Sequence, residues 1–302
     1  MMAPNAEMLA KVKSANGFIA ALDQSGGSTP KALQGYGYNG DEWSSDEEMF
    51  GLIHKMRTRI ISSPSFTGEK ILGAILFERT MDGEANGQPV PAYLWEKKGV
   101  VPFLKIDKGL AEEENGVQLM KPMPDLDTLL EKGVSKGIFG TKERSVIHLA
   151  NPAGIADVVG QQFEVATQVL RHGLVPIIEP EVNIKSAERA EADEILRDEI
   201  RRHLDRLPEG HEVMLKLSIP AKPGTFDDLI KHPRVLRVVA LSGGFSRSDA
   251  CRELARNPGM IASFSRALLE DLRQDMSEDQ FDRSLGEAID EIYEASTEKV
   301  AA

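Results

Sequence analysis

Short apolar runs alternate along the chain with longer segments in which apolar residues recur every three or four positions. The short runs are rich in Val, Ile, Leu and Phe and are nearly continuous, which is typical of parallel strands covered on both faces. We predict eight strands, over residues 17–23, 70–77, 100–107, 137–145, 174–182, 212–219, 235–244 and 259–268.

Helix-periodic segments separate several of these strands. Residues 44–63 open with a serine cap and an acidic first turn, and residues 151–173 have a proline near the start and a glycine at the end. Residues 187–207 are charged with a sparse apolar stripe, which predicts a surface helix. Two further helices are predicted after the last two strands, over residues 246–257 and 277–297.

About eight strand–helix alternations in 302 residues predict an α/β fold of the (β/α)8 TIM-barrel type. The alternative is a doubly wound open sheet, but no G-x-G-x-x-G follows the first strand, which weakens it. No composition shift marks a linker. We therefore expect residues 1–302 to form a single barrel domain with an N-terminal helical extension.

Charge and composition narrow the classes of function. The formal net charge is −12 and no run of basic residues forms a stripe, which argues against nucleic-acid binding. The N-terminus lacks an apolar signal core, and no stretch reaches the ~20 apolar residues of a membrane span. Cys251 is the only cysteine, so we expect a reducing, cytoplasmic setting.

Charged residues recur at the ends of five of the predicted strands. Catalytic groups of this fold lie at the carboxyl ends of the strands. A single charge there usually marks a solvated face, but five strands with the same polarity indicate a polar mouth. The adjacent Asp107 and Lys108 could pair with each other or with neighbouring charges. The strand-end charges are Asp23, Lys105, Asp107, Lys142, Arg144, Glu179, Glu181 and Lys216.

Lys216 lies within the apolar run EVMLKLSIP, residues 212–220. Burying a lysine without a partner costs free energy, so it lies either on a solvated edge strand or where its amine is needed. A neutral amine attacks a carbonyl to form a Schiff base, and the iminium lets a neighbouring C–C bond break without a metal. We expect a mouth rich in cations, in which Lys216 would have Lys142 and possibly Lys105 as neighbours. Like charges and partial burial would then lower the pKa of each lysine.

Two carboxyl groups could complete that chemistry. Dehydration of a carbinolamine needs an acid, and cleavage needs a base for a hydroxyl proton; Glu179 and Asp23 can supply these. Small-residue loops are found at the ends of strands one and seven, at residues 23–28 and 241–246, and Arg266 lies near the end of strand eight, where another helix should begin. Since such loops bind phosphate in this fold, two anion sites would suit a substrate with a phosphate at each end.

Seven motifs in order resemble those of class I fructose-bisphosphate aldolase, from residue 17 to about residue 268. They are ALDQSGGS, LKIDKG, TKERS, VPIIEPE, LKLSIP, LSGGFS and SFSRAL. The resemblance implies a lyase of glycolysis and gluconeogenesis that needs no cofactor and no metal. Its implied partner is a sugar bisphosphate, with no nucleic acid and no membrane. Self-association stays open, because the family includes tetramers and no interface motif is legible here.

The resemblance also implies roles for individual residues. Lys216 would form the Schiff base with carbon 2 of fructose 1,6-bisphosphate, and Glu179 would be the acid for dehydration. Glu181 would support the lysine network, Asp23 would take the proton from the carbon 4 hydroxyl, and Lys142 would polarise the substrate. The implied substrate-binding residues are Arg144 beside Lys142, then Ser242, Gly243, Ser265 and Arg266 around the carbon 1 phosphate, and Ser25, Ser28 and Lys105 around the carbon 6 phosphate.

The chain departs from the family at three points. Leu217 follows Lys216 where vertebrate enzymes have proline, and Ser265 replaces a glycine. The chain ends STEKVAA without the terminal tyrosine of animal enzymes, and we expect Tyr293 to pack within the last helix. Two alternatives stay open: a related lysine aldolase for another sugar phosphate such as tagatose bisphosphate, and a barrel that binds phosphate without catalysis. A zinc-dependent mechanism would need a cluster of histidines, and the sequence contains no H-x-H or H-E-x-x-H pattern.

Overall fold

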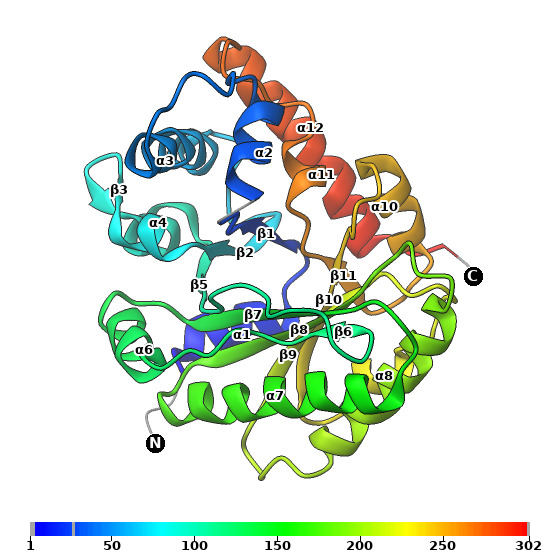
Figure 1. The fold of residues 1–302 in the computed structure, drawn as a ribbon. Helices are drawn as coiled ribbons and strands as arrows, with labels where there is room; N and C mark the ends of the chain where they lie inside the picture. The colour runs from blue at the N-terminus through cyan, green and yellow to red at the C-terminus, as the bar shows by residue number, and fades with distance from the viewer. Residues whose placement is uncertain (1–3, 26–27, 301–302) are drawn as a thin grey trace.

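The computed structural model describes residues 4–25 and 28–300, apart from the side chain of Ser28. Eight parallel strands form one sheet that nearly closes into a barrel with helices around it (Figure 1), which confirms the (β/α)8 prediction. In sheet order the strands are β1 (Phe18–Leu22), β2 (Ile71–Leu76), β5 (Val101–Lys105), β7 (Gly140–Ile147), β8 (Val175–Val182), β9 (Val213–Ser218), β10 (Val235–Leu241) and β11 (Met260–Ala262).

The five helices predicted from periodicity all form. Several short elements between β1 and β7 lacked a legible pattern. The helices are α1 (Ala6–Ser14), α2 (Ser28–Tyr36), α3 (Asp46–Ser62), α4 (Glu78–Asp82), α5 (Val90–Ala92), the π-helix η1 (Tyr93–Lys97), α6 (Leu126–Ser135), α7 (Pro152–Arg171), α8 (Arg189–Leu204), α9 (Asp227–Ile230), α10 (Arg247–Ala255), α11 (Arg266–Leu269) and α12 (Glu278–Thr297), and the minor strands are β3 (Glu84–Ala85), β4 (Gln88–Pro89) and β6 (Val117–Gln118).

Three predicted strand limits are wrong by three residues or more. The fourth strand begins at Gly140 rather than residue 137, the seventh ends at Leu241 rather than residue 244, and the eighth ends at Ala262 rather than residue 268. The barrel closes between β1 and β11, and because β11 has only three residues, few main-chain hydrogen bonds join the two strands. The main-chain N–H of Ala21 donates to the oxygen of Phe264 across this seam, at 3.1 Å.

The barrel interior has an apolar lower layer. Inward residues of the strands, such as Ile177 and Met214, pack there with Phe103 and with Met8 of α1. A Cβ on Gly140 would lie 2.9 Å from the Phe103 ring, so the glycine makes room for that ring. Arg237 of β10 holds α1 where the strands begin, because it donates to the main-chain oxygens of Val12 in the helix and of Ala15 directly after it.

The alternation of side chains explains the lysine of the apolar run. Residues 214 and 216 face the same side of β9, so Met214 in the apolar layer places Lys216 one step nearer the carboxyl end of the strand. The outward residues, including Leu215 and Leu217, join the larger core between sheet and helices. Within the described residues, none of the helices is long and apolar enough to cross a membrane.

Candidate active site

A line of buried charges is built from the residue directly after β1 and from residues of β7, β8 and β9. Lys142 is central, with its Nζ 2.6 Å from Oδ2 of Asp23 and 3.0 Å from Oε2 of Glu179. Nζ of Lys216 lies 3.1 Å from the other oxygen of Glu179. All four residues are less than 9% exposed. The structure therefore brings together four of the five residues with implied catalytic roles, in the order Asp23, Lys142, Glu179, Lys216.

Each strand contributes to this line through its register. Lys142 of β7 pairs with Ile177 of β8, and two residues further along Arg144 pairs with Glu179. On β9, Lys216 aligns with Val239 of β10. Because neighbouring parallel strands are stepped in this way, side chains from different strands converge at one level of the barrel.

The alternating charges set the protonation states of Asp23 and Lys142. Burial alone would raise the pKa of Asp23, but the ammonium groups of Lys142 and Lys216 hold it well below its ordinary range. Burial alone would lower the pKa of Lys142, but the carboxylates of Asp23 and Glu179 outweigh burial and raise it. We conclude that Asp23 is a carboxylate and Lys142 an ammonium group at neutral pH.

The expectation of a mouth dominated by cations is wrong. Each of its three lysines has a carboxylate oxygen within 3.1 Å. The third, Lys105, pairs with Oδ1 of Asp107 at 2.6 Å, and burial lowers the pKa of Lys105 although Asp107 opposes this. The carboxylates are there because a buried ammonium group without a counterion would be unfavourable.

Arg144 and Glu181 form a separate pair nearer the rim. Nη1 of Arg144 donates to Oε2 of Glu181 at 2.8 Å, and the Arg144 side chain is 41% exposed. Glu181 is thus paired with an arginine rather than with one of the lysines. An exposed guanidinium therefore lies near the buried line of charges.

The loops after β10 and β11 lie side by side. Gly243 and Gly244 have φ angles of +59° and +114°, which favour glycine, and they form the turn that follows Ser242. A Cβ on Gly244 would lie 3.5 Å from an Nη atom of Arg266, so the guanidinium rests over this turn. The structure therefore joins the two segments expected to bind one phosphate.

Ser265 and the loop after β1 face the same region. Ser265 precedes the first residue of α11, and its hydroxyl accepts a hydrogen bond from Nε2 of Gln24 at 2.7 Å. Ser25, the residue after Gln24, is partly buried. Ser28 is the first residue of α2, but its side chain lies outside the described part of the chain.

Sequence reasoning overlooked two buried residues next to Asp23. Gln24 belongs to the motif ALDQSGGS and Arg57 to the helix predicted over residues 44–63, but the sequence analysis assigns neither residue a role. Arg57 Nη1 donates to Oγ1 of Thr80 at 2.8 Å, and Nη2 donates to the main-chain oxygen of Gln24. Arg57 occupies the position four residues after Ile53, within the buried stripe of α3, and that spacing was a usable signal.

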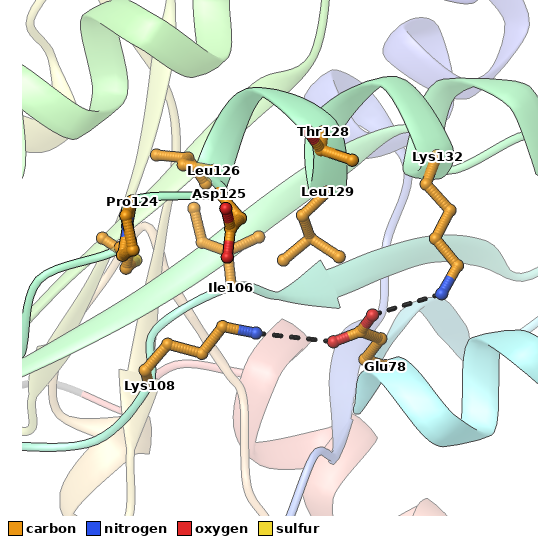
Figure 2. Close-up of a pocket in the computed structure, with 10 residues that line it drawn as sticks. Glu78, Ile106, Lys108, Pro124, Asp125, Leu126, Thr128, Leu129 and Lys132 are labelled. Carbon is orange, nitrogen blue, oxygen red and sulfur yellow. Dashed lines mark hydrogen bonds and ion pairs between the residues drawn. The ribbon is translucent and has the colours of Figure 1, made fainter.

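A cavity of about 310 Å³ lies between α4, α6 and the segment after β5. Figure 2 shows Glu78 between Lys108 and Lys132, at 3.4 and 3.2 Å from their amines. Lys108 therefore pairs with Glu78, and Asp107 pairs with Lys105, which answers the question left by their adjacency. None of the four residues of the buried line contributes to the cavity wall.

Tyr293 packs against the outer core on α12, with Nζ of Lys70 5.9 Å from its ring centre. In residues 4–25 and 28–300, no three His, Cys, Asp or Glu side chains gather in a way that could hold a metal ion.

The fold and this buried line define a (β/α)8 barrel with amine and carboxylate groups at its mouth. A family model described as "Glycolytic: Fructose-bisphosphate aldolase class-I" matches residues 6–218, which include all four residues of the line. The chain belongs to the class I fructose-bisphosphate aldolase family, and its fold and family are those of a lyase-type aldolase.

Solved structures support the fold at low sequence identity. A fructose-bisphosphate aldolase from Plasmodium falciparum superposes with a TM-score of 0.78 at 19% identity, covering 100% of this chain and 98% of the other. An archaeal fructose-1,6-bisphosphate aldolase, whose catalytic lysine carries a carbinolamine intermediate of the substrate, gives a TM-score of 0.51 at 12% identity, covering 95% and 98%.

Proposed function

We propose that the protein is a Schiff-base aldolase that reversibly cleaves fructose 1,6-bisphosphate into dihydroxyacetone phosphate and glyceraldehyde 3-phosphate without a metal. The observation that carries this proposal is the buried line in which Glu179 lies 3.1 Å from the amine of Lys216 and Lys142 lies 2.6 Å from Asp23. Family membership supports the class of chemistry.

The first half of the reaction uses Lys216 and Glu179. Glu179 takes a proton from Nζ of Lys216, the freed amine adds to the carbon 2 carbonyl, and Glu179 then returns the proton to the carbinolamine hydroxyl, which leaves as water. Glu179 suits this role because one of its oxygens contacts Lys216 while the other contacts Lys142. The iminium that results can accept an electron pair from a neighbouring bond.

The second half uses Asp23 and Lys142. Asp23 accepts the proton of the carbon 4 hydroxyl, the bond between carbons 3 and 4 breaks, and its electrons enter the iminium to give an enamine. Its lowered pKa keeps Asp23 available as a base. The ammonium group of Lys142 polarises the substrate oxygen beside it. Protonation of the enamine and hydrolysis then release dihydroxyacetone phosphate.

The phosphates are assigned to the two ends of the mouth. Ser242, Gly243, Ser265 and Arg266 would hold the carbon 1 phosphate, with the positive-φ turn exposing main-chain N–H groups. Arg144 at the rim would contact the sugar. For the carbon 6 phosphate, the proposed binding residues are Ser25, Ser28 and Lys105.

This proposal places the reaction in glycolysis or gluconeogenesis in the cytoplasm. It treats residues 1–302 as a single barrel domain in which α1 is the N-terminal extension. Self-association would use the outer surface, as the mouth is formed by one chain.

A cleavage assay with both ketose epimers tests the substrate. We expect fructose 1,6-bisphosphate to be cleaved with the higher kcat/KM and EDTA to have no effect. Preference for tagatose 1,6-bisphosphate would identify a different lysine aldolase, and binding without turnover between about pH 6 and 9 would indicate a non-catalytic barrel. Inhibition by EDTA that zinc reverses would contradict the metal-free mechanism.

A further inference from the structure

Arg57 is enclosed in the protein, although ion pairing does not explain its burial. Its side chain, on α3, is among the largest that are fully buried, and the residue is 1% exposed. Across the described ranges no carboxylate lies within ion-pairing distance of it. Burial lowers the pKa of Arg57 to about 10, so the guanidinium is charged at neutral pH. Because an unpaired buried charge is unfavourable, stability alone does not account for this residue.

The guanidinium joins the exits of two strands. Nη1 donates to Oγ1 of Thr80 in the helix after β2, at 2.8 Å. Nη2 donates to the main-chain oxygen of Gln24 directly after β1, and lies 3.3 Å from its side-chain Oε1. Asp23 is the preceding residue, and its charge is the one that opposes the effect of burial on the Arg57 pKa.

The contact with Arg57 orients the Gln24 side chain. With Oε1 toward the guanidinium, Nε2 points away and donates to Oγ of Ser265 at 2.7 Å. Ser265 directly precedes Arg266. The relay from Arg57 through Gln24 to Ser265 therefore crosses the seam between β1 and β11, where the strand bonding is sparse.

We propose that Arg57 is a positioning residue that, through Gln24 and Ser265, fixes Arg266 relative to Asp23. This inference rests on the proposed function, since it assigns the two fixed groups to a phosphate and to the carbon 4 hydroxyl of one substrate. Loosening the relay should weaken the holding of the phosphate more than the bond cleavage itself.

Three substitutions interrupt the relay: Arg57→Met, Gln24→Ala and Ser265→Ala. We expect each to raise KM for fructose 1,6-bisphosphate about tenfold while kcat stays within about threefold, because the amine and the carboxylates remain in place. Arg57→Lys should recover only part of KM, since an ammonium group lacks the planar fork that reaches both Gln24 and Thr80. Gln24→Ala leaves Arg57 bound to the main chain and to Thr80, so it tests the relay even if Arg57→Met folds poorly.

Arg59→Met is the matched control on the same helix. Arg59 donates to the main-chain oxygens of Gln274 and Met276 and pairs with Glu278, away from the relay. It should lower the melting temperature and leave KM unchanged. KM within twofold of the wild type for Arg57→Met and Gln24→Ala, or an equal rise in Arg59→Met, would overturn the proposal.

Hydrogen–deuterium exchange tests the positioning without a substrate. In Arg57→Met and Gln24→Ala, amides of residues 264–269 should exchange faster than in the wild type and in Arg59→Met. If the wild type does not cleave the bisphosphate, the proposed function fails, and exchange alone decides the role of Arg57. Unchanged exchange in this segment would contradict that role.

Discussion

Replacing Lys216 by methionine is expected to reduce cleavage of fructose 1,6-bisphosphate by roughly 10⁴-fold or more, because the amine that forms the Schiff base is gone. The barrel should remain folded. Methionine fills similar volume, and Glu179 keeps its contact with Lys142 at 3.0 Å after Lys216 is removed. Arginine at position 216 should be equally inactive, since it keeps the charge but is not a nucleophile. The measurement is a steady-state cleavage assay with circular dichroism of each variant.

Lys222→Met is the control for that substitution. Lys222 lies six positions further along, with a side chain that is 67% exposed and paired with Glu194. Its removal should change neither kcat nor KM by more than about twofold. Substantial activity in Lys216→Met would mean that another amine performs the chemistry.

Replacing Glu143 by methionine is expected to stabilise the protein by about 2 kcal/mol or more at pH 8, because it removes a buried acid that has no paired cation. Glu143 is fully buried on β7, and in the described chain neither of its carboxyl oxygens has a hydrogen-bond partner of good geometry, although the nearby Thr141 hydroxyl favours the charged form. Strand alternation turns it away from the mouth that Lys142 faces. Urea unfolding at several pH values measures the effect.

The pKa of Glu143 determines how the stabilisation by Glu143→Met changes with pH. Burial, followed by repulsion from Asp107, raises the pKa of Glu143 well above its ordinary value, and the attraction of Lys142 does not offset this. A folded-state pKa above the unfolded value of about 4.3 means that stability falls as pH rises from there to the folded pKa, by about 1.36 kcal/mol per unit. Glu143→Met and Glu143→Gln should remove that slope, so their advantage grows with pH.

Glu164→Gln provides the matched comparison. Glu164 is exposed on α7, so its neutralisation should change stability by less than about 0.5 kcal/mol at every pH. If Glu143→Met were destabilised at pH 8, the carboxyl group would have to be held by a partner in the folded state.

Periodicity was sufficient for the barrel because most of the strands are nearly continuous apolar runs and each long helix carries a cap or a stripe. It also located Lys216, since a lysine in the run EVMLKLSIP contradicts its surroundings. The limits of the eighth strand were not readable. Its segment carries apolar residues between Ser263, Ser265 and Arg266 as far as residue 268, which resembles a continuing strand, yet the chain turns after Ala262 to reach α11.

The partners of the charged groups depend on tertiary contacts that no local pattern encodes. Sequence spacing suggested a cluster of cations around Lys216, whereas the stepped strand register places Glu179 between it and Lys142. Arg57 lies 34 positions from Asp23 in the sequence, and only the folded barrel brings α3 against the end of β1. Glu143 has the same local sequence context as its charged neighbours but faces the opposite side of the strand.

Reductive trapping tests the central claim most directly. The protein is incubated with dihydroxyacetone phosphate, reduced with borohydride and digested, and the modified peptide is identified by mass spectrometry. The account predicts a single label on Lys216 in the peptide containing EVMLKLSIP. A label on Lys142, or no label on a folded protein, would contradict the assignment of Lys216 as the Schiff-base lysine.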